Sequence, residues 1–434
     1  MLRSGGEELG RRIQGIPSTL WIFLGFFASY LLFFIGPVFL SANSLQLFEP
    51  VPAAQHLGID LRLRLSWSAY SLRSEMPMPD GDGTVFPPFA NLLFAPLLGL
   101  EFSTAYKLLT VLTLLLYVFL TLWLPALIRG EHRLSSAAIL ICATGLISYG
   151  LQFELERGQW NVVAVSLALL AVWIFHRHRR QRFIAYVLFV VSVQLKVYPV
   201  VFLVLFVSDW RLWRENTIRF LLLAVANVLL FLVQGTRFFE IWLSGLRDWS
   251  ENTWIWEGNP SIRSAVTLAS DLAAKRGWTG LSSSVGLIVM ALSLVVVLCL
   301  VAILIHAYSH HASAPSGHYL LAAAIGCLLI PSGAYDYRLS ILGAPLVMVL
   351  LSEDAGGGTR LRNSGFLARR LAVLLMSFAY ATTLVPYTQK PYYLANNFPA
   401  LFVMLLTVTL LALTSDGHGS EPAVPARAQK VSPA

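Results

Sequence analysis

The sequence predicts an all-α integral membrane protein with about twelve transmembrane helices. Of its 434 residues, 56% are hydrophobic and 12% are charged, whereas an average soluble protein has about 25% charged residues. Apolar runs recur along the chain, and many are about as long as a helix that crosses the hydrocarbon core. The 3 cysteines fall within apolar runs and predict neither a metal site nor a disulfide.

The expected helices follow the apolar runs in order. The first run, Thr19 to Leu40, is too long for the apolar segment of a signal peptide, and no clear cleavage site follows it, so we expect a retained span. Several later runs are shorter than about 20 residues, which predicts helices that end in protein-lined cavities. The expected spans are 19–41, 104–128, 135–150, 160–175, 182–195, 197–208, 217–235, 286–307, 318–331, 339–352, 368–385 and 398–414.

These spans form one polytopic domain, residues 19–414. Residues 1–18 are expected to be a cytoplasmic N-terminal segment, and residues 415–434, rich in Pro, Ala, Gly and Ser, a disordered cytoplasmic tail. Two long connections, 42–103 and 236–285, are expected on the outer side. The first contains an apolar segment that is too short to span, which predicts an interfacial or re-entrant element.

The distribution of Lys and Arg predicts the topology. Basic runs at 176–180 and 210–214 flank the apolar stretch 183–207, and short basic connections stay in the cytoplasm. One straight helix would place one of these runs outside, so we expect two short segments that meet near Lys196. The short outer connections then contain four cations: Arg157, Lys196, Arg338 and Lys390.

Lys196 is expected at the outer end of this broken helical pair, because Pro199 cannot continue a helix. A lysine in a membrane is costly unless it meets an anion or a water-filled cavity, and a lipid phosphate is the obvious anion. The alternative is a structural anchor that snorkels to the interface. Arg338 has the planar fork that suits phosphate oxygens, but it could instead pair with Asp336.

Six short motifs share the outer side under this topology. They are Gly58-Ile59-Asp60, Phe86-Pro87-Pro88, Gly158-Gln159-Trp160-Asn161, Lys196-Val197-Tyr198-Pro199, Asn259-Pro260-Ser261 and Tyr335-Asp336-Tyr337-Arg338. In this order, over roughly residues 20–410, the chain resembles the GT-C glycosyltransferases, and specifically glycosyltransferase family 87, which includes mycobacterial mannosyltransferases. The family commonly carries a Trp and a His at the last of these turns, whereas this chain has Tyr335-Asp336-Tyr337-Arg338 there. This difference concerns the identity of the donor sugar and of the acceptor.

The resemblance implies a GT-C-type bundle with an interfacial first outer loop, and Asp60 as the general base. It implies inversion, because it provides one base and no covalent nucleophile. The residues expected to bind the donor phosphate or lipid are Lys196, Arg338 and Tyr198. The residues expected to bind the sugar or the acceptor are Gln159, Asn161, Asn259, Ser261, Tyr335, Asp336 and Tyr337. We expect no cofactor and no metal; Asp80 and Asp82 are weaker candidates for the base or for a divalent-ion site, because their Pro/Gly-rich segment is typical of turns.

The function implied is transfer of a mannose-like hexose or a pentose from a polyprenyl-phosphate donor to a hydroxyl of a lipid-linked or envelope glycan. The enzyme would lie in the bacterial inner membrane with its site on the extracytoplasmic face. A transporter or flippase of a lipid-linked sugar is the main alternative, since broken helices also occur in transporters. A ligase or polymerase of preassembled glycans is another.

Overall fold

The computed structural model describes residues 17–30, 57–73, 85–129, 134–146, 148–207, 209, 211–251, 255, 258–309, 317–355, 371, 373–376 and 396–414. Within this part the chain is helical and contains no β-strand, which confirms the all-α prediction. The N-terminal residues 1–16, Asp80, Asp82, Lys390, most of the expected span 368–385 and the tail from residue 415 lie outside the described residues.

Most of the expected spans coincide with helices. In chain order the helices are α2 (Ser18–Tyr30), α4 (Ile59–Arg73), α5 (Pro88–Phe94), η3 (Ala95–Gly99), α6 (Phe102–Val118), η4 (Phe119–Trp123), α7 (Leu124–Arg129), α8 (Ser136–Leu146), α9 (Tyr149–Arg157), α10 (Asn161–Arg177), η5 (Arg179–Gln181), α11 (Arg182–Leu195), η6 (Tyr198–Leu205), α12 (Trp213–Phe231), α13 (Thr236–Glu251), α14 (Ile262–Lys275), η7 (Thr279–Ser284), α15 (Val285–Ser309), α16 (Gly317–Leu329), η8 (Asp336–Leu342), α17 (Gly343–Ala355) and α20 (Phe398–Thr414). Of these, α4, α5, α13 and α14 lie outside the expected spans, and α9 lies largely outside them.

Within the residues that the structure describes, fewer helices qualify as membrane spans than the twelve expected for the whole chain. In the described chain, two helices are long and apolar enough to cross a membrane, Phe102–Leu127 and Gly280–Ser309. Two bent helix pairs raise this to as many as 4 if each pair is one span; one of them, Trp213–Phe231 with Thr236–Glu251, bends by 99°. The bundle of about twelve spans is therefore not confirmed, because many of its expected helices are short, as in α10, α16 and α20.

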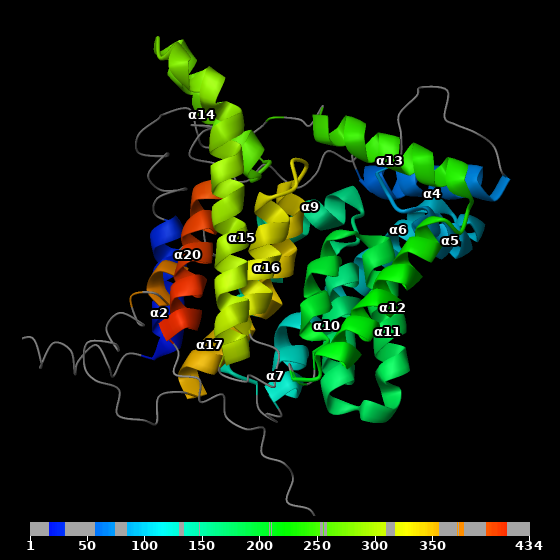
Figure 1. Ribbon diagram of the computed structural model, residues 1–434, viewed down its shortest axis with the longest axis horizontal. Helices are drawn as coiled ribbons and strands as arrows, with labels where there is room; N and C mark the ends of the chain where they lie inside the picture. Colours follow the sequence, from blue (N-terminus) through cyan, green and yellow to red (C-terminus); the bar gives the residue numbers. More distant parts are fainter. Residues whose placement is uncertain are drawn as a thin grey trace, which may run out of the picture.

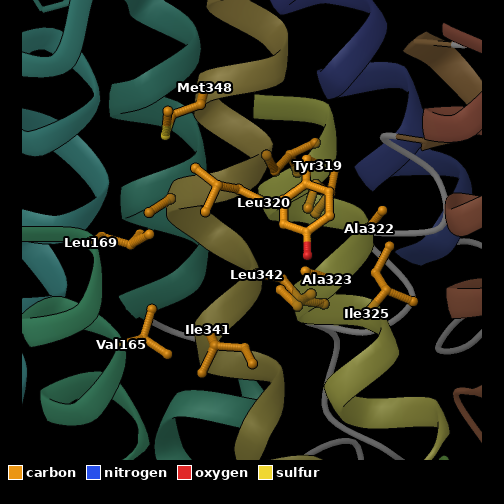
Figure 2. Close-up of a cluster of buried hydrophobic side chains, with 14 of the residues drawn as sticks. Val165, Leu169, Tyr319, Leu320, Ala322, Ala323, Ile325, Ile341, Leu342 and Met348 are labelled. Atoms are coloured by element: carbon orange, nitrogen blue, oxygen red, sulfur yellow. The ribbon is translucent and has the colours of Figure 1, made fainter. Parts of the chain in front are cut away.

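A continuous apolar core joins α10 to the C-terminal helices. Figure 2 shows part of this core, where Val165 and Leu169 of α10 face side chains of α16, η8 and α17. Every residue of α16 is buried, and α15, α17 and α20 pack around it. This packing holds η8 and the turn before it against the ends of α9 and α10.

Figure 1 shows α10, α11 and α12 upright, with α4 and α13 crossing one end of them. Asp60 therefore lies in the first turn of the crossing helix α4, whereas the sequence suggested a loop. Pro88 to Gly99, in α5 and η3, forms a short apolar helical segment beneath it, as expected for the segment that is too short to span. The turn between α10 and α11 lies at the opposite end of the bundle.

The chain turns back at Lys196, as the basic runs predicted. α11 ends at Leu195, Lys196 has an extended backbone (φ −148°, ψ 129°), and the next helix begins at Tyr198. The carbonyl of Leu205, at the end of η6, lies 2.8 Å from Nε2 of His176. Both basic runs thus lie at the same end of the bundle, and Lys196 lies at the other.

Candidate functional site

Asp60 is the centre of a hydrogen-bond network at the end of the bundle crossed by α4. Its side chain is 14% exposed and forms a two-pronged ion pair with Arg157, with Nε to Oδ2 at 2.9 Å and Nη2 to Oδ1 at 2.7 Å. Nε2 of Gln159 donates a further hydrogen bond to Oδ2. These three donors leave about one of the four acceptor positions of the carboxylate free.

Gln159 also connects Asp60 to Lys196. Nζ of Lys196 donates to Oε1 of Gln159 at 2.6 Å, so one amide bridges the carboxylate and the ammonium group. The Lys196 side chain is buried and lies 4.9 Å from the ring centre of Phe86 and 6.0 Å from that of Tyr337. It does not extend into solvent or lipid, so the geometry does not resemble a snorkelling anchor.

Two glycines allow α4 to approach the end of α9. Gly158 ends α9 with φ +67°, and a Cβ there would lie 2.9 Å from Cβ of Leu61. Gly58, with φ +66°, precedes α4 and donates its N–H to the carbonyl of Glu156 at 2.6 Å. Glycine adopts this left-handed conformation readily, so Arg157 and Gln159 can face Asp60 from either side of Gly158.

Glu154 ties together the elements that surround Lys196. Its carboxylate is fully buried, accepts the N–H of Val162 at 2.8 Å, and accepts the hydroxyl of Ser340. The first contact places this carboxyl group at the N-terminus of α10, where the helix dipole favours its charged form, while burial raises its pKa to about 7. The second fixes η8 against α9, which positions the turn that carries Tyr335 and Arg338.

Two further guanidinium groups, of Arg64 and Arg338, lie near Lys196. Arg64 follows Asp60 by one helical turn, is 2% exposed, and donates to Oδ1 of Asn91 at 3.2 Å. The guanidinium of Arg338 lies 5.7 Å from the ring centre of Tyr198, and within the described chain its buried Nε has no hydrogen-bond partner. Among the described residues, the site thus has more cationic than anionic side chains.

Burial and neighbouring cations shape the charge of this site. Burial lowers the pKa of Lys196 to about 7, with further lowering by the charges of Arg338 and Arg64 and opposition from Asp60 and Glu154. Burial raises the pKa of Asp336 to about 7, and the neighbouring Asn397 side chain opposes this rise. An incoming anion would stabilise the charged form of Lys196, because it would offset both burial and repulsion.

The remaining predicted site residues fall into two groups. Tyr198, Asn161, Tyr335 and Tyr337 lie close to the charged cluster: the Tyr198 hydroxyl lies 3.4 Å from Oδ1 of Asn161, and the rings of Tyr335 and Tyr337 are 5.7 Å apart. Asn259 and Ser261 instead bind the carbonyl of Ser332, at 2.8 and 3.0 Å. Their hydrogen bonds hold the loop before α14 to the turn that carries Asp336.

Sequence reasoning did not assign a role to three residues that the structure places in the network. Arg157 had been noticed as an outer cation, but its contact with Asp60 joins residues 97 positions apart. Arg64 carries a local signal, since a cation four residues after an aspartate faces the same side of a helix. Glu154 carries no such signal, because its partners Val162 and Ser340 come from different elements.

The chain also matches a known protein family. The model described as "Glycosyltransferase family 87" matches residues 85–331, which is more than half of the chain's 434 residues. The match covers Arg157, Gln159 and Lys196, while Asp60 lies 25 residues before its start and Arg338 lies 7 residues after its end. A search of curated proteins finds no match. The chain belongs to glycosyltransferase family 87.

Proposed function

We propose that this membrane glycosyltransferase transfers one sugar from a polyprenyl phosphate to a hydroxyl of a lipid-linked or envelope glycan. The sugar would be a mannose-like hexose or a pentose. The observation that carries the proposal is the bridge from Asp60 through Gln159 to the buried ammonium of Lys196. This bridge places a proton acceptor next to cations that can bind a phosphate. The reaction requires both a proton acceptor and a phosphate-binding group.

Asp60 would act as the general base. The acceptor hydroxyl would occupy the remaining acceptor position of the carboxylate and give it a proton as the acceptor oxygen attacks the anomeric carbon. A positioned base of this kind contributes about 10²–10⁴-fold to the rate. Arg157 and Gln159 would hold the carboxylate in the orientation that the attack requires.

The cations would stabilise the leaving group. As the bond between the anomeric carbon and the phosphate oxygen breaks, its electron pair stays on the polyprenyl phosphate, whose charge grows. Fixed cations close to that oxygen lower the barrier, because they are already in place when the charge develops. Lys196 and Arg338 would serve here, with Tyr198 between Arg338 and Asn161.

A single displacement would invert the anomeric carbon. Gln159, Asn161 and the Tyr335–Tyr337 turn would contact the sugar or the acceptor, and Asn259 and Ser261 would support that turn through Ser332.

We propose that no metal takes part, so turnover should be unchanged by a chelator such as EDTA. Loss of turnover with EDTA, restored by added Mg²⁺ or Mn²⁺, would contradict this.

The proposed location is a bacterial inner membrane, with the site on the extracytoplasmic face. The support for the face is the separation along α10, whose 17 residues place Asn161 about 25 Å from the basic run 176–180 at its other end.

The test is an assay of the purified protein in lipid vesicles with a panel of polyprenyl-phosphate sugars. Product with a new, inverted glycosidic bond supports the proposal. Movement of the lipid-linked sugar across the bilayer with no new bond would identify a flippase and contradict it. Transfer of a preassembled glycan in place of a single sugar would identify a ligase or polymerase.

A further inference from the structure

A long apolar groove lies between α11 and α12, away from the Asp60 network. Its volume is about 580 Å³, and side chains such as Val187, Val190, Leu222 and Ala226 line it. The lining runs along α12 from Glu215 to Leu230, which is about 22 Å of helix. One leaflet contributes about half of the ~30 Å hydrocarbon core, so the groove is long enough for an acyl chain.

The polar part of the groove lies at the end opposite Lys196. Its polar lining residues are Tyr186, Glu215 and Arg219, each near the start of its helix, and Phe89 and Leu230 line the other end. A lipid in this groove would therefore have its headgroup at the basic end. If the donor occupied the groove instead, its phosphate would lie at the other end, beside Lys196. Its apolar tail would then lie against Tyr186, Glu215 and Arg219, which would have no polar partner on the lipid.

Among the described charged side chains that act on Arg182, positive charge exceeds negative charge. The charges of Arg179, Arg219 and Glu215 all act on Arg182, which gives three guanidinium groups and one carboxylate. Arg219 uses Nε for Tyr186 and Nη1 for Phe206 and Asn216, so its Nη2 has no hydrogen bond to the described residues. Among the described residues, Arg182 donates one hydrogen bond, from Nε to the carbonyl of Phe175 at 3.4 Å.

Exposed aromatic side chains indicate where these charged groups lie relative to the membrane surface. Phe183 is 75% exposed and Trp213 is 64% exposed, and both lie at the first residues of their helices. Exposed Trp residues at helix ends are typical of the boundary between the hydrocarbon and the headgroups. Trp213 is the first residue of α12, and the charges of Glu215 and Arg219 in the same part of α12 act on Arg182. Arg182 is therefore at the level of the lipid headgroups, with the groove extending from it into the hydrocarbon.

We propose that this groove binds an anionic phospholipid, with its phosphate beside Arg182 and Arg219 and one acyl chain between α11 and α12. Basic pockets between membrane helices are suited to anionic headgroups. A phosphatidylglycerol headgroup adds hydroxyls that can donate to Glu215, which offsets the repulsion between that carboxylate and the phosphate. The lipid would occupy the leaflet at the basic end of the bundle, so its binding is independent of the donor.

Native mass spectrometry of the detergent-purified protein, titrated with phosphatidylglycerol or phosphatidylcholine, tests the proposal. The wild-type protein should bind phosphatidylglycerol at least about fivefold more tightly, since each arginine near an anionic lipid contributes about 1 kcal/mol. Arg182→Gln should remove most of this preference. Arg129→Gln, at the last residue of α7 at the same end of the bundle (Figure 1), should retain it.

A second pair of variants tests the groove itself. Val187→Trp should fill the groove and weaken binding of both lipids, whereas Val225→Trp should leave both unchanged, because Val225 is similarly exposed (52% against 43%) but does not line it. Equal affinity for the two lipids in the wild-type protein would overturn the proposal. A second result would also overturn it. If polyprenyl phosphate displaces phosphatidylglycerol from the wild-type protein but not from Lys196→Gln, the groove binds the tail of the donor.

Discussion

At the scale of single residues, the buried ammonium of Lys196 makes a strong prediction about donor binding. Lys196→Gln should weaken donor binding by about 10- to 150-fold, because it removes a charge-assisted contact that contributes about 1.5–3 kcal/mol. The measurement is a donor titration of the reconstituted variant, with correct insertion verified by its elution and thermal unfolding. Unchanged donor affinity in a well-folded variant would show that Lys196 does not contact the phosphate.

The same residue predicts a pH dependence. Burial lowers the pKa of Lys196 to about 7, so its ammonium form predominates below that pH and declines above it. The donor phosphodiester keeps its single charge in this range, so donor affinity should fall as the pH rises from 6 to 8.5. Lys196→Arg, which stays charged, should show a weaker dependence. An identical pH profile in both proteins would contradict this assignment.

Arg157 should influence turnover more than donor binding if its main partner is Asp60. Arg157→Lys keeps the charge but loses the two-pronged contact at 2.9 and 2.7 Å. We expect turnover to fall by roughly 10²-fold, since small errors in the position of a reacting group have effects of this size. Steady-state kinetics would show it as a loss in kcat with little change in KM. A change confined to KM would place Arg157 on a substrate instead.

At the scale of elements, the contact between α4 and α9 depends on Gly158. Gly158→Ala should cost about 1–2 kcal/mol for the left-handed backbone, and the new Cβ would press on Cβ of Leu61 at 2.9 Å. Both stability and turnover should fall, because α4 would move away from Arg157 and Gln159. Gly99→Ala is the matched control, since its Cβ would meet nothing within 4 Å. Thermal unfolding and turnover that are equal in the two variants would show that the close approach is unimportant.

The elements themselves could largely be predicted from the sequence. Apolar runs identify a helix because burial and internal hydrogen bonding both favour it in a membrane, and Pro199 with the two basic runs identified the reversal at Lys196. The network around Asp60 could be predicted only in part. Its hydrogen bonds to Arg157 and Gln159 join residues that are far apart in the sequence. These residues are brought together by the packing of α9 against η8 and α4, and no local sequence pattern encodes that packing.

At the scale of the whole molecule, the two ends of the bundle should face opposite compartments. A cysteine at Arg247 on α13 should react with an impermeant thiol reagent added outside intact cells, whereas one at Arg179 should not. Both positions are exposed, so accessibility to the reagent decides the result. The background must lack Cys142, Cys299 and Cys327. Labelling at Arg179 but not at Arg247 would reverse the proposed topology and place the site in the cytoplasm.

The central claim is that Asp60 removes a proton during sugar transfer, and Asp60→Asn tests it most directly. Asparagine keeps the size of the side chain but removes the proton acceptor, so turnover should fall by at least about 10²-fold. Donor affinity should change little, because a base acts mainly in the transition state. Asp80→Asn and Asp82→Asn should have mild effects, and thermal unfolding would verify that each variant folds. Near-normal turnover in Asp60→Asn, with collapse in either of the other variants, would move the base to another residue and contradict the account.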